Sequence, residues 1–185
     1  MNKSLIELSK ELEEKNKLLE KLASTDSLTG IYNRRFFVEL AKKELYEIKR
    51  YNKTDTLLIL DVDNFKQIND EYGHMYGDKA LKAFSKVCSS EIRGGDIFGR
   101  IGGEEFAIIL TNTSINNAVT FAERLRNLVS KIEIEVQNKK FSLTISIGIT
   151  NILPDESIYK VMSMADKALY EAKGKGRNRV EILER

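Results

Sequence analysis

Hydrophobic positions along the chain follow two different periods, which predicts a mixture of strands and helices. Short apolar runs that fit strands occupy residues 56–62, 97–101, 105–110, 141–150 and 180–183. Apolar residues recur at helical spacing over residues 33–50, 65–71, 78–92, 116–131 and 157–173. Strands interleaved with helices, with one antiparallel hairpin, predict an α+β fold: an α/β sandwich in which helices flank a mixed central β-sheet.

The first 24 residues differ from the rest, because their leucines fall at heptad spacing. The positions of this seam are Leu5, Leu8, Leu12, Leu19 and Leu22. Lys15 occupies one core position of the pattern, and so short a coiled coil is marginal in isolation. We therefore expect an N-terminal helical linker over residues 1–24 and a separate domain over residues 25–185. An upstream sensory domain in a full-length protein is expected, with a native start at Met1 as the alternative.

Composition narrows the class of protein. A chain of 185 residues with 42% hydrophobic side chains can bury a sizeable core. A net charge of +2 is too small to favour nucleic-acid binding. No run approaches the roughly 20 apolar residues of a membrane span, and no signal peptide is evident. Cys88 is the only cysteine, so an intramolecular disulfide is excluded; we expect it in the core of a cytoplasmic protein.

Two glycines and two carboxylates interrupt a predicted hairpin, in the sequence Gly102-Gly103-Glu104-Glu105. Adjacent glycines are expected to supply a turn with positive φ and to leave room for a ligand near the backbone. Consecutive acids favour a divalent cation, because Mg²⁺ prefers oxygen ligands.

A second acidic segment, Asp61-Val62-Asp63, ends an apolar strand. Side chains alternate along a strand, so Asp61 and Asp63 share a face, and Val62 offers only its carbonyl there. If the hairpin lies beside this strand, Asp61, Glu104 and Glu105 can surround one or two Mg²⁺ ions. That arrangement suits metal-assisted phosphoryl transfer. Zinc is disfavoured, because no histidine or cysteine cluster is present.

These segments, taken together, resemble the GGDEF family of diguanylate cyclases in its GGEEF variant. The matching segments stand in the family's order at residues 26–35, 61–70, 73–78, 102–106 and 165–178. The resemblance covers residues 25 to about 184. It implies a palm-like nucleotidyl cyclase fold and a catalytic domain that condenses two GTP into cyclic di-GMP (3′–5′) and two pyrophosphates. It also implies dependence on Mg²⁺, with Mn²⁺ as a substitute, and a homodimer, because each subunit binds one GTP.

The resemblance assigns the metal ligands and the catalytic groups. Asp61, the carbonyl of Val62 and Glu104 are implied to hold Mg²⁺, with Glu105 as an additional ligand. Glu104 doubles as the proposed base, and Lys66 stabilises charge on the reacting phosphates.

The resemblance also assigns the groups that bind the substrate. Asn69 and Asp78 match the positions that hydrogen-bond guanine, which offers donors that adenine lacks. His74 matches a position near the nucleotide, or alternatively caps a helix. The triphosphate contacts are assigned to Gly102, Gly103, Lys173 and Arg177.

An inhibitory product site is implied by Arg93 and Asp96, which match the family's Arg-x-x-Asp motif at the expected distance before Gly102. Arginine grips phosphates and guanine edges with two hydrogen bonds, and aspartate accepts from guanine. Arg124 matches a second arginine that contacts the bound cyclic di-GMP. An ordinary charged turn is the alternative interpretation of Arg93 and Asp96.

Two other functions remain open at the level of the sequence. The first is a catalytically inactive receptor for GTP or cyclic di-GMP, although such receptors usually lose the acids or glycines that are present here. The second is a related cyclase with another nucleotide, including mixed cyclic GMP-AMP products, against which Asp78 argues.

Overall fold

A mixed six-stranded sheet forms the centre of the molecule, with the strand order β1-β3-β4-β2-β7-β8. The computed structural model describes residues 2–137 and 139–184. The strands of this sheet are β1 (Tyr32–Asn33), β2 (Asp55–Val62), β3 (Ile97–Arg100), β4 (Glu105–Leu110), β7 (Ile145–Ile152) and β8 (Val180–Ile182). β2 pairs antiparallel with both β4 and β7, and all eight of its residues are buried. A separate two-stranded sheet pairs β5 (Glu133–Val136) with β6 (Lys139–Ser142).

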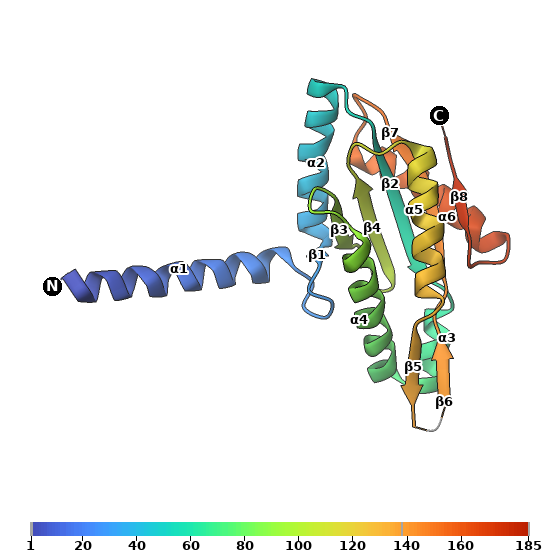
Figure 1. Ribbon diagram of the computed structural model, residues 1–185, viewed down its shortest axis with the longest axis horizontal. Helices are drawn as coiled ribbons and strands as arrows, with labels where there is room; N and C mark the ends of the chain where they lie inside the picture. The colour runs from blue at the N-terminus through green and yellow to red at the C-terminus, as the bar shows by residue number, and fades with distance from the viewer. Residues whose placement is uncertain (1, 138, 185) are drawn as a thin grey trace.

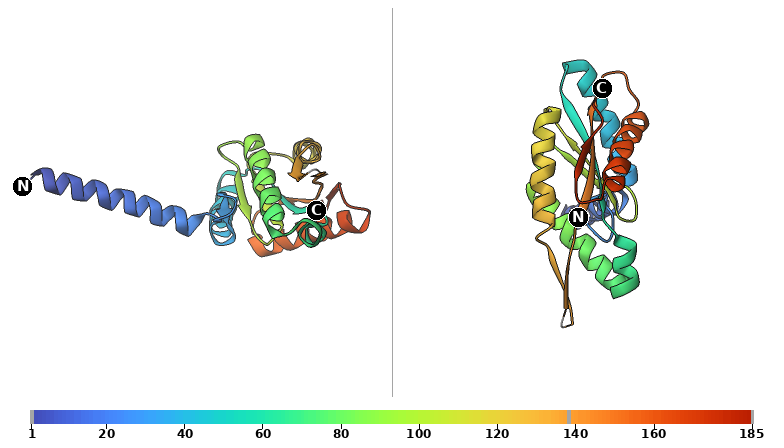
Figure 2. Two further views of the ribbon diagram at one scale, coloured as in Figure 1. Left: turned by 90° about the horizontal axis from the view of Figure 1, so that it is seen from below. Right: turned by 90° about the vertical axis from the view of Figure 1, so that its right-hand side faces the viewer.

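Helices cover both faces of the central sheet, which gives three layers (Figures 1 and 2). The helices are α1 (Asn2–Ser24), α2 (Arg34–Tyr51), α3 (Phe65–Tyr72), α4 (His74–Glu91), α5 (Ile115–Val129) and α6 (Ile158–Gly174). α4 and α5 pack on one face, and α2 and α6 pack on the other. α3 follows β2 directly and lies against α4.

Side-chain alternation along β2 builds two hydrophobic cores, one on each face of the sheet. Leu58 and Leu60 contribute to the core under α4 and α5, whereas Leu57 and Ile59 contribute to the core under α2 and α6. Cys88, which the sequence places in the core, is fully buried in the first of these. The expected α+β sandwich with a mixed sheet is thereby confirmed.

The expected elements are present, with three corrections. The predicted single strand over residues 141–150 is wrong, because the chain leaves β6 at Ser142 and enters β7 at Ile145 in a different sheet. The predicted helix over residues 78–92 begins earlier, at His74, because Gly73 adopts a φ of 87° that separates it from α3. The sequence pattern missed β1, which has only two residues, and β5, in which Glu133 and Glu135 are exposed.

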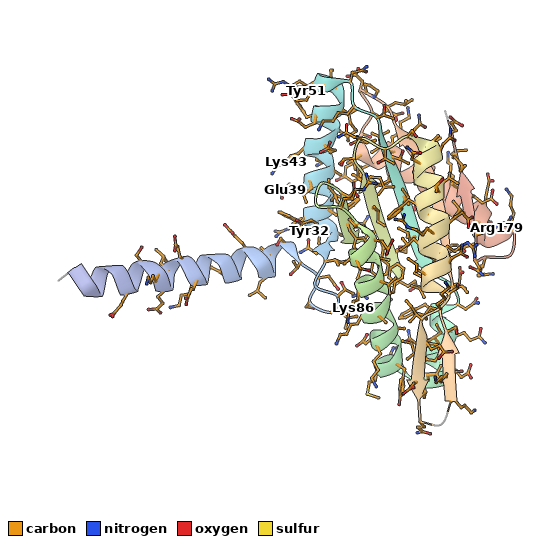
Figure 3. All side chains as sticks on the ribbon, viewed as in Figure 1. Tyr32, Glu39, Lys43, Tyr51, Lys86 and Arg179 are labelled. Carbon is orange, nitrogen blue, oxygen red and sulfur yellow. The ribbon has the colours of Figure 1, made fainter. Side chains whose placement is uncertain are left out.

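Helix α1 projects away from the sheet, and its last turn lies against β1 and α2 (Figures 1 and 3). Four leucines of the heptad seam are exposed: Leu8 at 63%, Leu12 at 60%, Leu19 at 62% and Leu22 at 67%. The side chain of Leu5, the fifth leucine of the seam, is not among the side chains that the structure describes. No helix in the described chain has the length and apolarity that crossing a bilayer requires.

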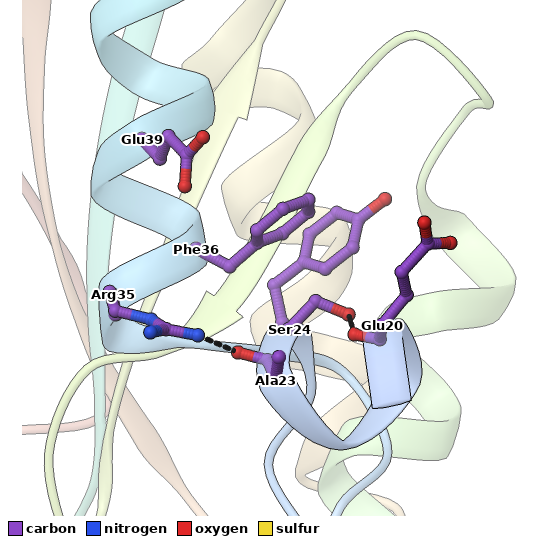
Figure 4. A pocket seen from close by; sticks show the side chains of 7 residues that line it. Glu20, Ala23, Ser24, Arg35, Phe36 and Glu39 are labelled. Carbon is purple, nitrogen blue, oxygen red and sulfur yellow. Dashed lines mark hydrogen bonds between the residues drawn. The ribbon is translucent and has the colours of Figure 1, made fainter. Parts of the chain in front are cut away.

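The end of α1 is tied to the start of α2. Arg35 and Asn33 both donate to the carbonyl oxygen of Ala23, over 2.6 and 3.0 Å. A hollow of about 760 Å³ opens beside this junction, between the last turn of α1 and the first turns of α2 (Figure 4). Helix α1, which we call the stalk, is therefore held at its base. A charge-assisted bond from Arg35 and a neutral bond from Asn33 satisfy a carbonyl in its last turn.

At Gly148, β7 lies directly against the backbone of α6, and replacement of this glycine tests the packing. A Cβ atom there would collide with the carbonyl oxygen of Ala165 and the amide nitrogen of Leu169, both of them backbone atoms of α6. Rotation of a side chain cannot relieve such a clash. We therefore expect Gly148→Ala to lower the free energy of unfolding by about 1–3 kcal/mol, as judged by urea denaturation.

Gly174→Ala is the matched control, because a Cβ at this α6 position meets nothing within 4 Å. Alanine is favoured over glycine in helices by up to about 1 kcal/mol, so this variant should be at least as stable as the wild type. Equal unfolding midpoints for the two variants would contradict the packing account.

Candidate active site

Two acidic segments meet at one end of the central sheet, because β2 and β4 are neighbours in it. Asp61 on β2 and Glu105 on β4 are direct cross-strand partners, so their side chains project from the same face. The backbone N–H of Val62 donates to the carbonyl oxygen of Glu104 over 3.2 Å. The strand end and the glycine-rich turn therefore lie together, as the sequence predicts.

Backbone hydrogen bonds close the turn between β3 and β4. The N–H groups of Ile101 and Gly102 both donate to the carbonyl oxygen of Glu105, over 2.9 and 3.2 Å. Neither Gly102 nor Gly103 has a positive φ, so the expectation of a left-handed turn at these glycines is wrong. A Cβ on Gly103 would meet nothing within 4 Å. The glycine leaves open space beside the backbone, which a ligand can use.

Arg100 links this turn to the segment that follows the stalk. Its Nε and Nη2 atoms donate to the carbonyl oxygen of Gly103 over 3.1 and 2.6 Å. Its Nη1 donates to Asp26 over 3.0 Å. Burial raises the pKa of Asp26, but hydrogen bonds from Thr29 and Arg100 outweigh it and hold this pKa below its ordinary value.

The Asp61 carboxyl group lies in an electrostatically strained position. It is only 5% exposed, and its Oδ2 pairs with Nζ of Lys173 over 2.8 Å. Burial raises the pKa of Asp61 to about 6; Lys173 opposes this shift, while the charges of Glu104 and Glu105 add to it. A further cation at this point would relieve the cost of the ionised form.

A cavity of about 500 Å³ opens at this end of β2. Six of the sequence-predicted site residues line it: Asp61, Val62, Lys66, Glu104, Lys173 and Arg177. Carboxylates and cations therefore face the same space. The predicted residues that do not line it are Asn69, His74, Asp78, Gly102, Gly103 and Glu105.

The residues assigned to guanine lie together at the junction of α3 and α4. The side chain of Asn69 packs so closely on Gly77 that a Cβ there would collide with its Oδ1 atom. Asp78 follows Gly77 directly and is exposed. His74 is the exposed first residue of α4, and it lies outside the lining of the cavity.

The sequence analysis missed several polar residues near the cavity. Gln67 and Asp70 line it together with Lys66. Their spacing along α3 places them on the same helical face as Lys66, so a helical projection of this segment could have identified them. Partial burial raises the pKa of Asp166 on α6, Glu105 raises it further, and Arg34 is among the cations that oppose the shift.

The oxygen atoms at the cavity fit a hard divalent cation. Asp61, Val62 and Glu104 line one space, and carboxylate and carbonyl oxygens are the donors that Mg²⁺ prefers. Within residues 2–137 and 139–184, no three His, Cys, Asp or Glu side chains gather as a metal cluster. Asp61, Val62 and Glu104 stay the predicted ligands, and Glu105, which shares the face of Asp61 but does not line the cavity, stays a further predicted ligand.

A second charged cavity, of about 250 Å³, lies at the other end of β3 and β4. Arg93, Asp96 and Arg124 all line it. Asp96 is held in place by the backbone N–H of Thr111, over 3.0 Å, and of Arg93, over 3.2 Å. Arg124 pairs with Glu91 over 3.1 Å at the rim. The three residues assigned to the inhibitory site are thus brought together.

A family model described as "Diguanylate cyclase, GGDEF domain" matches residues 23–179. The chain belongs to the GGDEF family. This GGDEF chain is 40% identical over 171 residues to diguanylate cyclase A of Treponema denticola, a match that covers 90% of the chain and 46% of that protein. It is 37% identical over 172 residues to the probable diguanylate cyclase DgcC of Escherichia coli, covering 92% of the chain and 46% of that protein.

The GGDEF chain thus spans about half the length of these two curated relatives. Among solved structures, it resembles the coiled coil and GGDEF domain of DgcB from Caulobacter crescentus, which was determined in complex with c-di-GMP. The TM-score is 0.88 at 31% identity, and the match covers 98% of each chain. The likeness therefore extends over the α1 stalk as well as the α/β domain.

The raised pKa of Asp61 predicts a specific pH dependence of stability in metal-free buffer. Because the native pKa of about 6 exceeds the ordinary value of 3.8, the native state binds the extra proton between these values. The contribution of Asp61 to stability therefore falls as the pH rises through that window. We expect Asp61→Asn to become more stable relative to the wild type across it, by on the order of 1 kcal/mol after solvent screening.

The measurement is urea unfolding of both proteins at a series of pH values with a chelator present. Asp70→Asn, which neutralises an exposed carboxylate at the rim of the same cavity, is the control and should show a much smaller effect. A stability difference for Asp61→Asn that does not change with pH would contradict the electrostatic account.

Proposed function

We propose that this chain is a diguanylate cyclase, which condenses two GTP into cyclic di-GMP with 3′–5′ linkages and releases two pyrophosphates. One observation carries the proposal. The carboxylates of Asp61 and Glu104 and the cations of Lys66, Lys173 and Arg177 line a single cavity at the end of β2. Acids that can hold Mg²⁺ beside cations that can hold a triphosphate are the parts that phosphoryl transfer requires.

Asp61, the carbonyl of Val62 and Glu104 are the proposed Mg²⁺ ligands, and Mn²⁺, which takes the same oxygen donors, should substitute. When bound, the metal supplies a positive charge that lowers the pKa of the ribose 3′-hydroxyl and neutralises the attacked phosphate. Glu104 stands at the turn, half-buried at the cavity edge. Its carboxylate is the proposed acceptor of the hydroxyl proton.

The triphosphate is proposed to lie among three cations and the glycine turn. Lys66 on α3 and Arg177 after α6 are exposed, so both side chains can move onto a phosphate. Lys173 already pairs with Asp61, and it would share its charge with the phosphates. The N–H of Gly102 is taken by the carbonyl oxygen of Glu105, so Gly103, where a Cβ would meet nothing within 4 Å, is the proposed donor of a backbone N–H to a phosphate.

Base selectivity is proposed to lie with Asn69 and Asp78, on either side of Gly77 at the junction of α3 and α4. A carboxylate there accepts from the N1–H and the exocyclic amine of guanine. Adenine would leave it without those donors, which discriminates strongly in a site that is built around hydrogen bonds.

A homodimer is part of the proposal, because one cavity holds one GTP and the reaction joins two. The exposed leucines of α1 support pairing of two stalks as a coiled coil. Such pairing raises the effective concentration of one nucleotide site near the other. An upstream sensory domain that sets the geometry of the stalk remains a proposal for a full-length protein.

Feedback by the product is proposed at the cavity of Arg93, Asp96 and Arg124. Cyclic di-GMP carries two phosphates and two guanine edges, which suit guanidinium forks and an accepting carboxylate. Asp96 is already fixed by hydrogen bonds from Thr111 and Arg93, so its orientation needs little reorganisation on binding.

The activity is tested by incubating the purified chain with GTP, ATP or both in the presence of Mg²⁺ and resolving the products by mass spectrometry. We expect cyclic di-GMP from GTP and no product from ATP alone. Glu104→Gln should reduce the rate at least about a hundredfold, because a proton acceptor and a metal ligand are lost together. Glu39→Gln, which alters an exposed glutamate on α2, should retain the wild-type rate.

Other outcomes separate the alternatives. Binding of GTP or cyclic di-GMP without any cyclic dinucleotide product would support the inactive receptor. A mixed cyclic GMP-AMP product would support the related cyclase. An unaltered rate in Glu104→Gln would overturn the assignment of the active site.

The inhibitory site predicts that Arg93→Ala makes synthesis less sensitive to added cyclic di-GMP. Loss of charge-assisted hydrogen bonds should raise the half-inhibitory concentration about tenfold or more, while the uninhibited rate stays close to the wild type. Lys86→Ala, which removes an exposed cation from the neighbouring helix α4 (Figure 3), should leave the half-inhibitory concentration unchanged. Equal product sensitivity in the wild type and Arg93→Ala would count against this site.

A further inference from the structure

Asp63 is a buried carboxylate with a saturated set of donors next to the cavity. It is 4% exposed, and it is not among the residues that line the cavity. Its Oδ1 accepts from Ser146 Oγ over 2.7 Å. Its Oδ2 accepts from Thr144 Oγ1 over 2.8 Å and from the backbone N–H of Asn178 over 3.0 Å. Because Ser146, Thr144 and Asn178 together donate to both oxygens, the side chain must accept at each of them. A carboxylate does so, whereas an amide has only one acceptor oxygen.

The bond to Asn178 reaches a loop that is distant in sequence, between α6 and β8. Gly176, Arg177 and Asn178 have φ values of 111°, 63° and 46°, so three successive residues adopt the left-handed region. Outside glycine, this conformation costs roughly 1–2 kcal/mol per residue and persists only where the surroundings impose it. The loop therefore needs external restraints.

The structure supplies two such restraints at Asn178. Asp63 accepts the backbone N–H of Asn178, and Arg126 on α5 donates from Nη1 to the Asn178 side chain over 2.9 Å. Within the loop, the N–H of Arg177 donates to the carbonyl oxygen of Ala172 over 3.0 Å. Asp63, which directly follows β2, thus helps to hold the backbone of Arg177, the residue before Asn178.

That preceding residue, Arg177, has the side chain that reaches the cavity. Among the described residues, its guanidinium makes no hydrogen bond or ion pair. The backbone of the loop consequently sets where this mobile side chain starts, beside the cavity. A change in the φ of Arg177 would swing the guanidinium away from the cavity without breaking any contact of its own.

We propose that Asp63 is a positioning residue, which holds Arg177 toward the triphosphate through the N–H of Asn178. The inference rests on the proposed function for its ligand, the triphosphate. The hydrogen bond from Asn178 to Asp63 is independent of that function. The carboxylate never touches the nucleotide. Its role is to hold the left-handed loop in place, so that the backbone of Arg177 stays beside the cavity and its side chain is within reach of a phosphate before the ligand binds.

Binding of inorganic triphosphate, measured by calorimetry with Mg²⁺ present, tests this role in Asp63→Asn. The two possible effects of the substitution have opposite signs. Removal of a negative charge near a polyanion site should tighten binding if only electrostatics act. A weaker loop restraint should instead weaken binding, by about tenfold, because the hydrogen bond from Asn178 to a charged carboxylate is replaced at best by a bond to a neutral amide oxygen. We expect the weaker binding.

A double-mutant cycle with Arg177→Ala shows whether Asp63 acts through Arg177. In the Arg177→Ala background, Asp63→Asn should no longer weaken triphosphate binding, because the side chain that it aims is absent. Thr150→Val is the control for general destabilisation. It removes a buried hydroxyl bond from β7 to the carbonyl oxygen of Leu183 and should leave triphosphate binding unchanged.

Asn178→Ala keeps the measurement decisive if Asp63→Asn does not fold. It retains the N–H that Asp63 accepts and the cost of the left-handed backbone, but it removes the contact with Arg126, so it loosens the same loop from its other side. We expect a smaller loss of triphosphate affinity that again disappears in the Arg177→Ala background.

The outcomes distinguish this inference from the proposed function. Tighter or unchanged triphosphate binding in Asp63→Asn, or an equal loss with and without Arg177, overturns the positioning role even if the wild type makes cyclic di-GMP. An Arg177-dependent loss supports the role even if no cyclic dinucleotide forms, in which case the proposed function fails alone. A wild-type chain that does not bind triphosphate overturns the positioning role.

Discussion

The pairing of β2 with β4 is the constraint on which the candidate site depends. It sets Asp61 opposite Glu105 and brings the backbone of Val62 within hydrogen-bond reach of Glu104. A slip of one residue would turn Asp61 to the other face of the sheet. Two hydrophobic cores oppose such a slip, because alternate residues of β2 are buried under different pairs of helices. The apolar packing of the strand therefore fixes the position of the acids.

This packing buries the Asp61 carboxylate, and the free-energy cost of its ionised form makes the site favour a bound cation. The Asp61 carboxyl group is buried beside other acids, so its pKa rises, and Lys173 compensates only in part. Such a site gains from a divalent cation, and a bound cation together with Lys66 and Arg177 then favours a polyanion. Asp63 shows the opposite solution, since three donors satisfy its carboxylate within the protein. The two aspartates of one strand end thus serve different purposes.

Much of the fold could be predicted from the sequence, because most elements carry an unbroken hydrophobic period. The alternation through residues 141–150 wrongly predicted a single strand, because Leu143 is buried even though the chain passes from one sheet to the other there. Site residues within contiguous motifs, such as Asp61 and Glu104, could be found. The partners of Asp63 could not, because Asn178 is separated from it by 115 positions and contributes a backbone N–H that no residue type encodes.

The central claim is that Asp61 and Glu104 hold one divalent cation beside a guanine nucleotide. Crystals grown with Mn²⁺ and a non-hydrolysable GTP analogue test it most directly, because manganese can be located by its anomalous scattering. The account predicts an anomalous peak in contact with carboxylate oxygens of Asp61 and Glu104 and the carbonyl of Val62, with the triphosphate near Lys173 and Arg177. A nucleotide bound with its metal away from Asp61 and Glu104 would contradict it.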